Sequence, residues 1–264
     1  MTEDAVNAYI WNLRRNRSSN QKVQKFVEAL WRFLFYLAFC IIGYRTLFTP
    51  TTVSWVTNSA EFWNDWPMHD LTESIAFYYQ VELGAYFHQL LWTEVARSDA
   101  LEMIIHHFVT IFLVTLSYLT NFTRIGTAIL LLHDSADVFL ESAKVFNYIS
   151  KTPGGSWSKP ICDGLFFSFA ITFFITRLIF YPRHILYSVV ITAQSLFGFS
   201  LAYFTFAGLL TILQILHIFW FYLIARMIYL EFFGGGINRD IRSDDEAFEN
   251  DGHSSKDSKD DKDD

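Results

Sequence analysis

Apolar residues in this chain are gathered into blocks of about twenty, the length that a helix needs to cross the hydrocarbon core of a bilayer. Inside hydrocarbon, every backbone N–H and C=O group must be hydrogen-bonded within the segment, which restricts such blocks to helices. Composition agrees, because 52% of the 264 residues are hydrophobic and only 18% are charged, whereas soluble domains carry about 25% charged residues. The sequence predicts an all-α integral membrane protein with about six transmembrane helices. The predicted spans are Leu30–Phe48, Thr72–Trp92, Met103–Thr120, Ile125–Asn147, Ile161–Tyr181 and Phe206–Phe232.

The apolar region Pro182–Tyr203 leaves the number of spans open. It is compatible with a re-entrant or interfacial segment and also with a seventh span. Basic residues favour six spans, because the cytosolic loops of membrane proteins are enriched in Lys and Arg. With six spans, the basic N-terminal segment falls on the same side as Lys151, Lys159, Arg239 and Arg242. Both termini are then predicted to lie in the cytosol, whereas a seventh span would move the tail across the membrane.

Composition divides the chain into three parts. Residues 1–29 form a basic cytosolic segment, residues 30–233 the transmembrane domain, and residues 234–264 an acidic cytosolic tail that we expect to be disordered. Ser243 precedes three acidic residues and is a phosphorylation candidate, although a solvated tail accounts for the same pattern equally well. Cys40 and Cys162 lie in apolar surroundings and give neither a disulfide framework nor a metal-ligand spacing, so no metal site is predicted.

Polar side chains interrupt the fourth predicted span and share one face of its helix. At roughly 100° per residue, they fall within an arc of about 100°. They are His133, Asp134, Asp137, Glu141 and Lys144. A charged group in hydrocarbon is costly, so this face must point into a bundle interior or a wet cavity. The third span opens with His106-His107, followed at helical spacing by Thr110 and Ser117, and we expect the two sets to meet.

These residues closely resemble the signature of the ceramide synthase branch of the TLC-domain family. The matching positions are His106-His107-x-x-Thr110, Ser117-Tyr118, Asn121-x-x-Arg124-x-Gly126, His133-Asp134-x-x-Asp137, Leu140-Glu141-x-Ala143-Lys144 and Tyr148. Tyr78-Tyr79-x-x-Glu82-Leu83, Thr176-Arg177-Leu178, Leu216-His217-Ile218-Phe219-Trp220 and Asp240-x-Arg242-Ser243-Asp244-x-Glu246 are similar to the family too. Animal members usually have a further transmembrane span and a homeobox-like segment before the point where this chain begins. Of that segment, only the end is recognised here, in Trp11 to Phe26.

The resemblance implies a multi-pass protein of the endoplasmic reticulum membrane that transfers a fatty acyl group from acyl-CoA to the amine of a sphingoid base. The expected product is ceramide or dihydroceramide, with acyl-CoA as co-substrate and no bound cofactor. The expected partners are membrane lipids, the two substrates, and a second ceramide synthase chain in a homo- or heterodimer. No nucleic-acid partner is expected, because a partial basic segment at a membrane lacks a recognition helix.

This chemistry fits the residues independently of the resemblance. The amine must lose its proton before it can attack a thioester, and histidine suits that proton transfer near neutral pH. We therefore expect His106 or His107 to act as general base, or alternatively as a nucleophile that forms an acyl-imidazole. Asp134 and Asp137 are expected to orient the imidazole and to stabilise its charge. The candidates for a supporting role are His133, Glu141, Lys144 and Arg124, whereas single histidines such as His217 are more often contacts between helices.

A long acyl chain needs an apolar tunnel between helices. In the family, the segment before the last span influences the choice of chain length. The tunnel candidates are therefore Phe197, Phe199, Tyr203, Phe204 and Phe206, although an ordinary apolar hairpin would have the same composition.

Two other classes of function compete with an acyltransferase. A metal-dependent membrane hydroxylase or desaturase needs several spaced histidine boxes, and this chain has a single His-His pair with scattered single histidines. A non-catalytic regulator or lipid-binding partner of full-length ceramide synthases is the remaining alternative. The intact polar residues argue against it, because a scaffold has no need of costly charges in lipid.

Overall fold

The computed structural model describes the backbone of residues 3–49, 54–91 and 99–233, with all side chains there except those of residues 3–21, 56–57, 196–197 and 231–233. Every regular element within these ranges is a helix. The longer ones are α1 (Glu3–Leu47), α3 (Glu73–Leu91), α4 (Ala100–Leu119), α5 (Thr123–Ser150), α6 (Lys159–Phe173), the π-helical η3 (Phe174–Leu186) and α8 (Leu201–Phe233). The shorter ones are α2 (Ser54–Thr57), η1 (Ser59–Trp63), η2 (Gly155–Ser158), η4 (Ser188–Ala193) and α7 (Gln194–Phe197).

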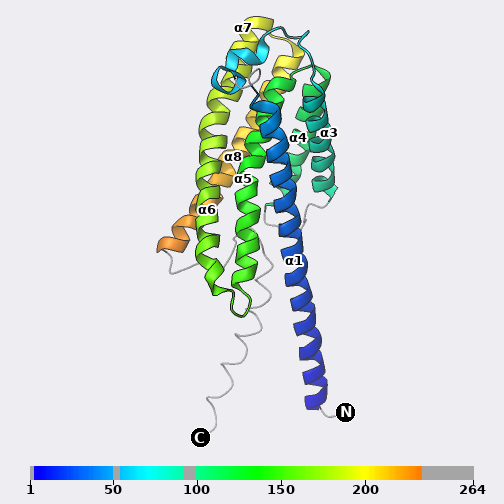
Figure 1. The fold of residues 1–264 in the computed structure, drawn as a ribbon, viewed down its shortest axis with the longest axis vertical. Coiled ribbons are helices and arrows are strands. Elements are labelled where there is room, and N and C mark those ends of the chain that lie inside the picture. Colours follow the sequence, from blue (N-terminus) through cyan, green and yellow to red (C-terminus); the bar gives the residue numbers. More distant parts are fainter. Residues whose placement is uncertain (1–2, 50–53, 92–98, 234–264) are drawn as a thin grey trace.

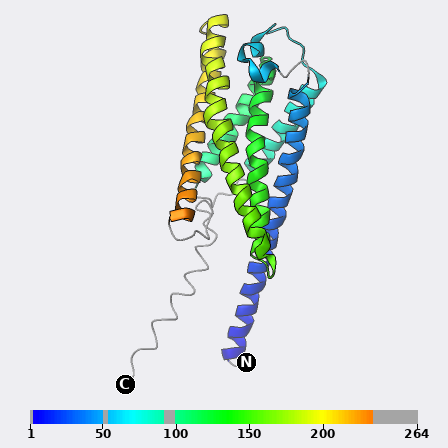
Figure 2. The ribbon, with the colours of Figure 1, turned by 60° about the vertical axis from the view of Figure 1, so that its left-hand side comes forward.

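The long helices form six passes that run alternately up and down a bundle, namely α1, α3, α4, α5, the run from α6 to α7, and α8 (Figure 1). Within the described ranges, four segments are long and apolar enough to cross a membrane, Lys22–Leu47, Ala100–Leu119, Gly155–Ala193 and Leu201–Leu230. The other two passes, α3 and α5, bury charged groups such as Glu82 and Asp134. The start of α1 and the end of α8 lie at the same end of the bundle (Figure 2). The prediction of an all-α, multi-pass membrane protein is confirmed.

The region 182–203 belongs mainly to the fifth pass. α6 continues without a break through η3 and η4 to the end of α7, where Gly198, at φ 68°, turns the chain toward α8. In η3 the N–H of Tyr187 donates to the carbonyl of Pro182, five residues earlier. This wider winding accommodates a proline, which has no N–H and would clash with the carbonyl one turn before it in a regular helix. The region is therefore neither a re-entrant loop nor a seventh span.

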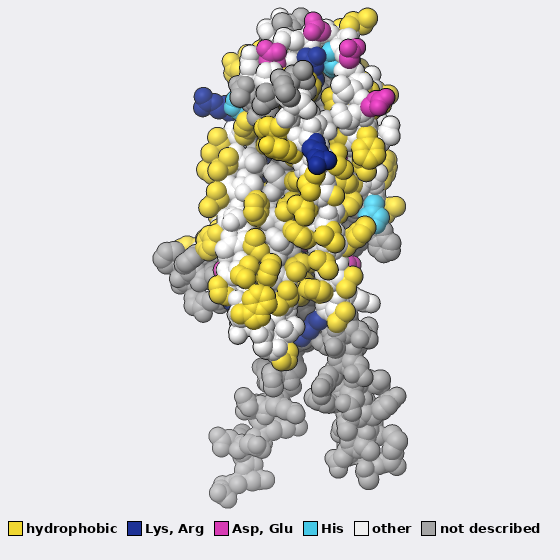
Figure 3. Space-filling view, in the orientation of Figure 1, with side chains coloured by type: hydrophobic (Ala, Val, Ile, Leu, Met, Phe, Trp, Pro, Cys, Tyr) yellow, Lys and Arg dark blue, Asp and Glu magenta, His cyan; other side chains and the backbone are white. Residues whose placement is uncertain are grey.

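α5 is the centre of the bundle and contacts α1, α3, α4, α6 and η3. The outer faces of the passes are apolar, with exposed residues such as Leu34, Phe112 and Ile215. Figure 3 shows hydrophobic side chains over the middle of one face and charged side chains gathered at its upper end. An apolar exterior around buried polar groups is the arrangement that a bilayer requires.

One end of the bundle is covered by a cap, which we define as residues 54–72. Its Trp63 Nε1–H donates to Ser188 Oγ in η4 over 2.7 Å, and its Trp66 Nε1–H donates to the carbonyl of Thr120 over 2.9 Å. Arg124, at the start of α5, donates to two cap carbonyls and lies 5.1 Å from the ring centre of Trp55. The cap is thereby fixed to three different passes.

Candidate active site

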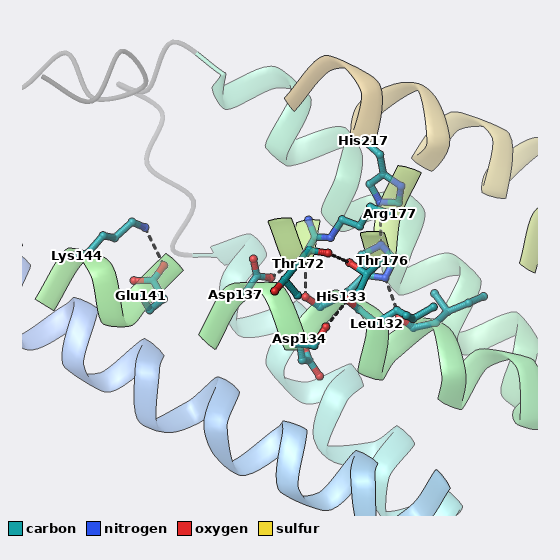
Figure 4. Close-up of polar contacts among 12 residues, drawn as sticks. Leu132, His133, Asp134, Asp137, Glu141, Lys144, Thr172, Thr176, Arg177 and His217 are labelled. Carbon is teal, nitrogen blue, oxygen red and sulfur yellow. Dashed lines mark hydrogen bonds and ion pairs between the residues drawn. The ribbon is translucent and has the colours of Figure 1, made fainter. Parts of the chain in front are cut away.

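Four histidines from three helices converge inside the bundle. His133 of α5 is buried, and its Nδ1–H donates to the carbonyl of Ile129 over 2.7 Å, since a carbonyl oxygen can only accept. In a neutral ring the Nε2 atom of His133 is then an acceptor, so the Nε2–H of His217 in α8 donates to it over 2.9 Å. The two rings therefore fix one another's tautomers (Figure 4).

The His106-His107 pair of α4 completes this group. Both rings are buried, and their centres are 5.5 Å apart. The ring of His106 lies 6.2 Å from that of His133 and 5.2 Å, edge to face, from that of Trp220 in α8. Its Nδ1 atom is buried and has no hydrogen-bond partner among the residues described. Such an atom is available to a reacting group, because nothing else in this part of the chain occupies it.

The carboxylates of α5 are held by different partners. Asp134 accepts a hydrogen bond from the hydroxyl of Tyr78 on α3 over 3.2 Å. Asp137 instead faces η3, where Arg177 Nη2–H donates to its Oδ2 over 3.2 Å. Each carboxylate thus ties α5 to a different neighbour.

Arg177 joins the carboxylate and imidazole parts of this interior. It also donates to the carbonyl of His133 over 2.8 Å, and its guanidinium lies 4.6 Å from the ring centre of Phe173. Figure 4 shows Arg177 lying between Asp137 and the pair formed by His133 and His217. One buried cation thereby neutralises Asp137 and fixes the backbone at His133.

A narrow apolar cavity extends from His133 between α4, α5, η4 and α8. About 40 Å³ of it is wide enough for a water molecule. Its lining on α5 runs from His133 to Phe122, a distance of roughly 16 Å at the helical rise. On α4 the lining residues are Thr110, Leu113, Val114 and Ser117, one stripe of a helix. The imidazole of His133 therefore lies at one end of a long, thin, apolar space, and the other three imidazoles adjoin His133 and do not line that space.

Residues 25–226 match the family model of the TLC domain. The chain is 41% identical to human Ceramide synthase 4 over 233 residues, which are 88% of this chain and 57% of that protein. It is 36% identical to human Ceramide synthase 5 over 89% of this chain and 58% of that one. It is 35% identical to Ceramide synthase LOH2 of Arabidopsis thaliana over 87% of this chain and 77% of that one. The chain belongs to the ceramide synthase branch of the TLC-domain family. It spans 57% of the length of its human Ceramide synthase 4 relative.

The TLC domain includes every member of the polar interior. Of the residues expected to be catalytic, the structure brings His106, His107 and Asp134 into one buried region and places Asp137 at its edge, with its side chain 24% exposed. His133, expected in support, is instead the centre of the hydrogen-bonded group. The roles of these residues in catalysis stay predictions.

Other expected residues of the TLC domain lie apart from this group. Glu141 and Lys144 form an ion pair of 2.7 Å farther along α5 (Figure 4). Arg124 lies at the opposite end of α5, where it binds the cap. His217 was expected to be a contact between helices, and the structure shows it hydrogen-bonded to His133 of α5. Arg177 was expected only as part of a family motif, and its polarity inside the membrane was the signal for a site role. Ser243 and its phosphorylation lie outside the described residues, as does the predicted disorder of the tail.

The expected tunnel residues divide into lining and exposed ones. Phe206 is buried and lines the cavity of the TLC domain. Tyr203 is half-buried, and its hydroxyl donates to the carbonyl of Val190 over 3.2 Å. Phe199 and Phe204 are 69% and 59% exposed and stack on one another outside the cavity. The side chain of Phe197 is outside the described part of the structure.

No group of three His, Cys, Asp or Glu residues within the described ranges is arranged to hold a metal ion. The prediction that the protein has no metal site stays a prediction, because it concerns the whole protein. The residues that are described offer imidazoles for proton transfer or nucleophilic attack, next to an apolar cavity.

Proposed function

We propose that this protein is a ceramide synthase that transfers a fatty acyl group from acyl-CoA to the amine of a sphingoid base. The observation that carries the proposal is a cluster of buried imidazoles, one of which, His133, lines one end of a long apolar cavity. We place the acyl chain in this apolar space with its thioester carbon beside His133, whose ring centre lies 6.2 Å from that of His106. The family relationship supports the same chemistry, since its named relatives are ceramide synthases.

The reaction forms an amide bond and breaks the thioester bond. The amine loses one proton as it attacks the carbonyl carbon, and CoA leaves as a thiolate that takes up one proton. An imidazole of His106 or His107 accepts the first proton and returns it to the thiolate. In the covalent alternative, the same imidazole attacks the thioester first, and the amine then resolves the acyl-imidazole.

The neighbouring groups hold this imidazole in place. Trp220 and His133 flank His106, and the pairing of His133 with His217 keeps those two rings from turning. Two carboxylates place negative charge next to these rings. That of Asp137 pairs with Arg177, and that of Asp134 accepts a hydrogen bond from Tyr78. We expect the acyl-CoA headgroup to enter from the cytosol at the end of the bundle opposite the cap, in the endoplasmic reticulum membrane.

The test uses the full chain, purified in lipid nanodiscs, with sphinganine and radiolabelled acyl-CoAs of graded length. We expect labelled dihydroceramide from the wild type and none from His107→Ala, while His88→Ala, which changes an exposed histidine, stays active. Product at the wild-type rate from both His107→Ala and His106→Ala would contradict the assigned chemistry. Failure of the folded wild type with every pair of substrates would favour the non-catalytic regulator instead.

A second measurement separates the two mechanisms. Incubation with labelled acyl-CoA and no amine traps an acyl-histidine if the covalent route operates, and hydroxylamine would release the label. Direct attack predicts no labelled protein and a rate that depends on both substrates being bound together.

A further inference from the structure

The far end of the apolar cavity is closed by a cluster of aromatic rings that includes the cap. Phe122, which precedes α5, lines the cavity at this end together with Phe206 of α8. The ring centres of Phe122 and Phe206 are 4.8 Å apart. Behind Phe122 lie two tryptophans of the cap, Trp63 at 5.3 Å edge to face and Trp66 at 5.2 Å. The end wall is therefore two rings deep.

The rings behind Phe122 are held in position by hydrogen bonds. The indole N–H of Trp63 donates to Ser188 Oγ over 2.7 Å, and the Ser188 hydroxyl donates to the carbonyl of Ser59 over 3.2 Å. The indole N–H of Trp66 donates to the carbonyl of Thr120. Trp63 is 4% exposed and Ser188 is fully buried. A wall fixed in this way cannot retreat without breaking buried hydrogen bonds.

We propose that Phe122, backed by Trp63 and Trp66 of the cap and paired with Phe206, is the residue that sets the longest acyl chain the enzyme accepts. This inference rests on the proposed function, because it assigns the cavity to the acyl chain. It moves the determinant from the exposed hairpin rings Phe199 and Phe204 to the start of α5 and the cap.

The expected effect follows from packing. One methylene more or less in an apolar pocket changes the rate by roughly 10- to 200-fold. Replacing Phe122 by Ala removes the ring that closes the cavity, so chains too long for the wild type gain room at the cap. We expect the ratio of kcat/KM for a longer over a shorter acyl-CoA to rise about tenfold in this variant.

The experiment compares Phe122→Ala with Phe204→Ala on a series of acyl-CoAs that differ by two carbons. Phe204→Ala is the matched control, because it removes an identical ring near Phe206 but on the exposed side. A shift of the length profile in Phe122→Ala, with Phe204→Ala unchanged, is the expected result. Equal shifts in both variants, or an unchanged profile in Phe122→Ala, would overturn the proposal. Phe122→Leu, a smaller change, replaces Phe122→Ala in the same comparison if the latter does not fold.

A binding measurement separates this inference from the proposed function. In the His107→Ala background, the thermal midpoint of the full chain is followed with fatty acids of graded length. We expect the length that gives the largest stabilisation to increase when Phe122→Ala is added. The same shift without turnover in the wild type would support the end wall and contradict the synthase activity. Turnover in the wild type with no shift in either assay would contradict only the end wall.

Discussion

Two ends of the same buried stretch of α5, at His133 and at Phe122, are held by different forces. Around His133, hydrogen bonds from α8, η3 and α5 itself fix the ring and its backbone. Around Phe122, ring contacts define the shape, and the hydrogen bonds are one layer farther back in the cap. The first region is specified by donor and acceptor positions, and the second by volume. Substitutions should therefore have sharp effects at His133 and graded effects at Phe122.

Arg177→Met is expected to cause the largest loss of stability and activity. It leaves the carboxylate of Asp137, at the edge of the buried region, without a cation, and it removes the donor to the carbonyl of His133. Breaking a buried ion pair costs about 3 to 5 kcal/mol, so we expect a comparable fall in the free energy of unfolding together with loss of acyltransfer. Unfolding in detergent titrations measures the first and product formation the second. Arg183→Met, at an exposed arginine of the same helix, is the control. A stable, active Arg177→Met protein would contradict the central role of this cation.

A smaller effect is expected from His217→Phe, which removes the donor to Nε2 of His133 but keeps a ring of similar shape. Loss of one buried hydrogen bond costs about 1 to 1.5 kcal/mol, which corresponds to roughly a tenfold fall in kcat with little change in KM. His217→Gln keeps an N–H donor and should recover part of the rate. If Gln and Phe reduce kcat equally, the hydrogen bond to His133 does not matter to catalysis.

At the cap, Trp63→Phe keeps a ring but loses the indole donor to Ser188, and Ser188→Ala removes the acceptor. We expect each variant to lower the free energy of unfolding by about 1 kcal/mol, with full activity on short acyl-CoAs. In the double variant the two losses should not fully add, because both remove the bond from Trp63 to Ser188, although Ser188→Ala also removes the bond from Ser188 to the carbonyl of Ser59. Additive losses would show that the bond between cap and η4 contributes nothing.

The smallest effect concerns pH and His69, which lies in the cap outside the membrane spans. Burial, and then the positive charge of Arg124, hold the pKa of His69 below its ordinary value of 6.5. The unfolded chain therefore binds a proton below about pH 6.5 that the folded chain does not, so stability falls as the pH is lowered through that value. Thermal midpoints between pH 7 and pH 5 should show this loss, and His69→Gln should reduce it. An equal loss in both proteins would assign it to other groups.

What the sequence could predict depended on whether the signal was local. The shared face of His133, Asp134 and Asp137 follows from helical spacing alone, and the structure buries it as expected. The sequence could not identify His217 as the hydrogen-bond partner of His133. The two residues are 84 positions apart, and this spacing does not reveal which helices face one another. Region 182–203 was undecidable, because its apolar composition does not reveal that π-helical winding takes Pro182 into a continuous helix.

The same limit applied to the end of the cavity. The aromatic residues between positions 197 and 206 were equally good tunnel candidates from sequence, and only Phe206 among those described lines the space. Phe122 gave no signal, because its importance comes from the cap packing behind it. Contacts between aromatic rings from distant parts of the chain leave no periodic pattern in the sequence.

The direction of the hydrogen bonds between the histidines has one further consequence. The Nδ1–H of His133 donates to a main-chain oxygen and its Nε2 accepts from His217, so neither ring nitrogen of His133 is left to pass a proton on. A proton taken up at His106, whose ring centre lies 6.2 Å from that of His133, could not leave through this pair of rings unless both exchanged tautomers. The proposed amide formation from a thioester suits a site from which protons cannot easily leave, since the proton that the amine loses is the one that the departing thiolate takes up.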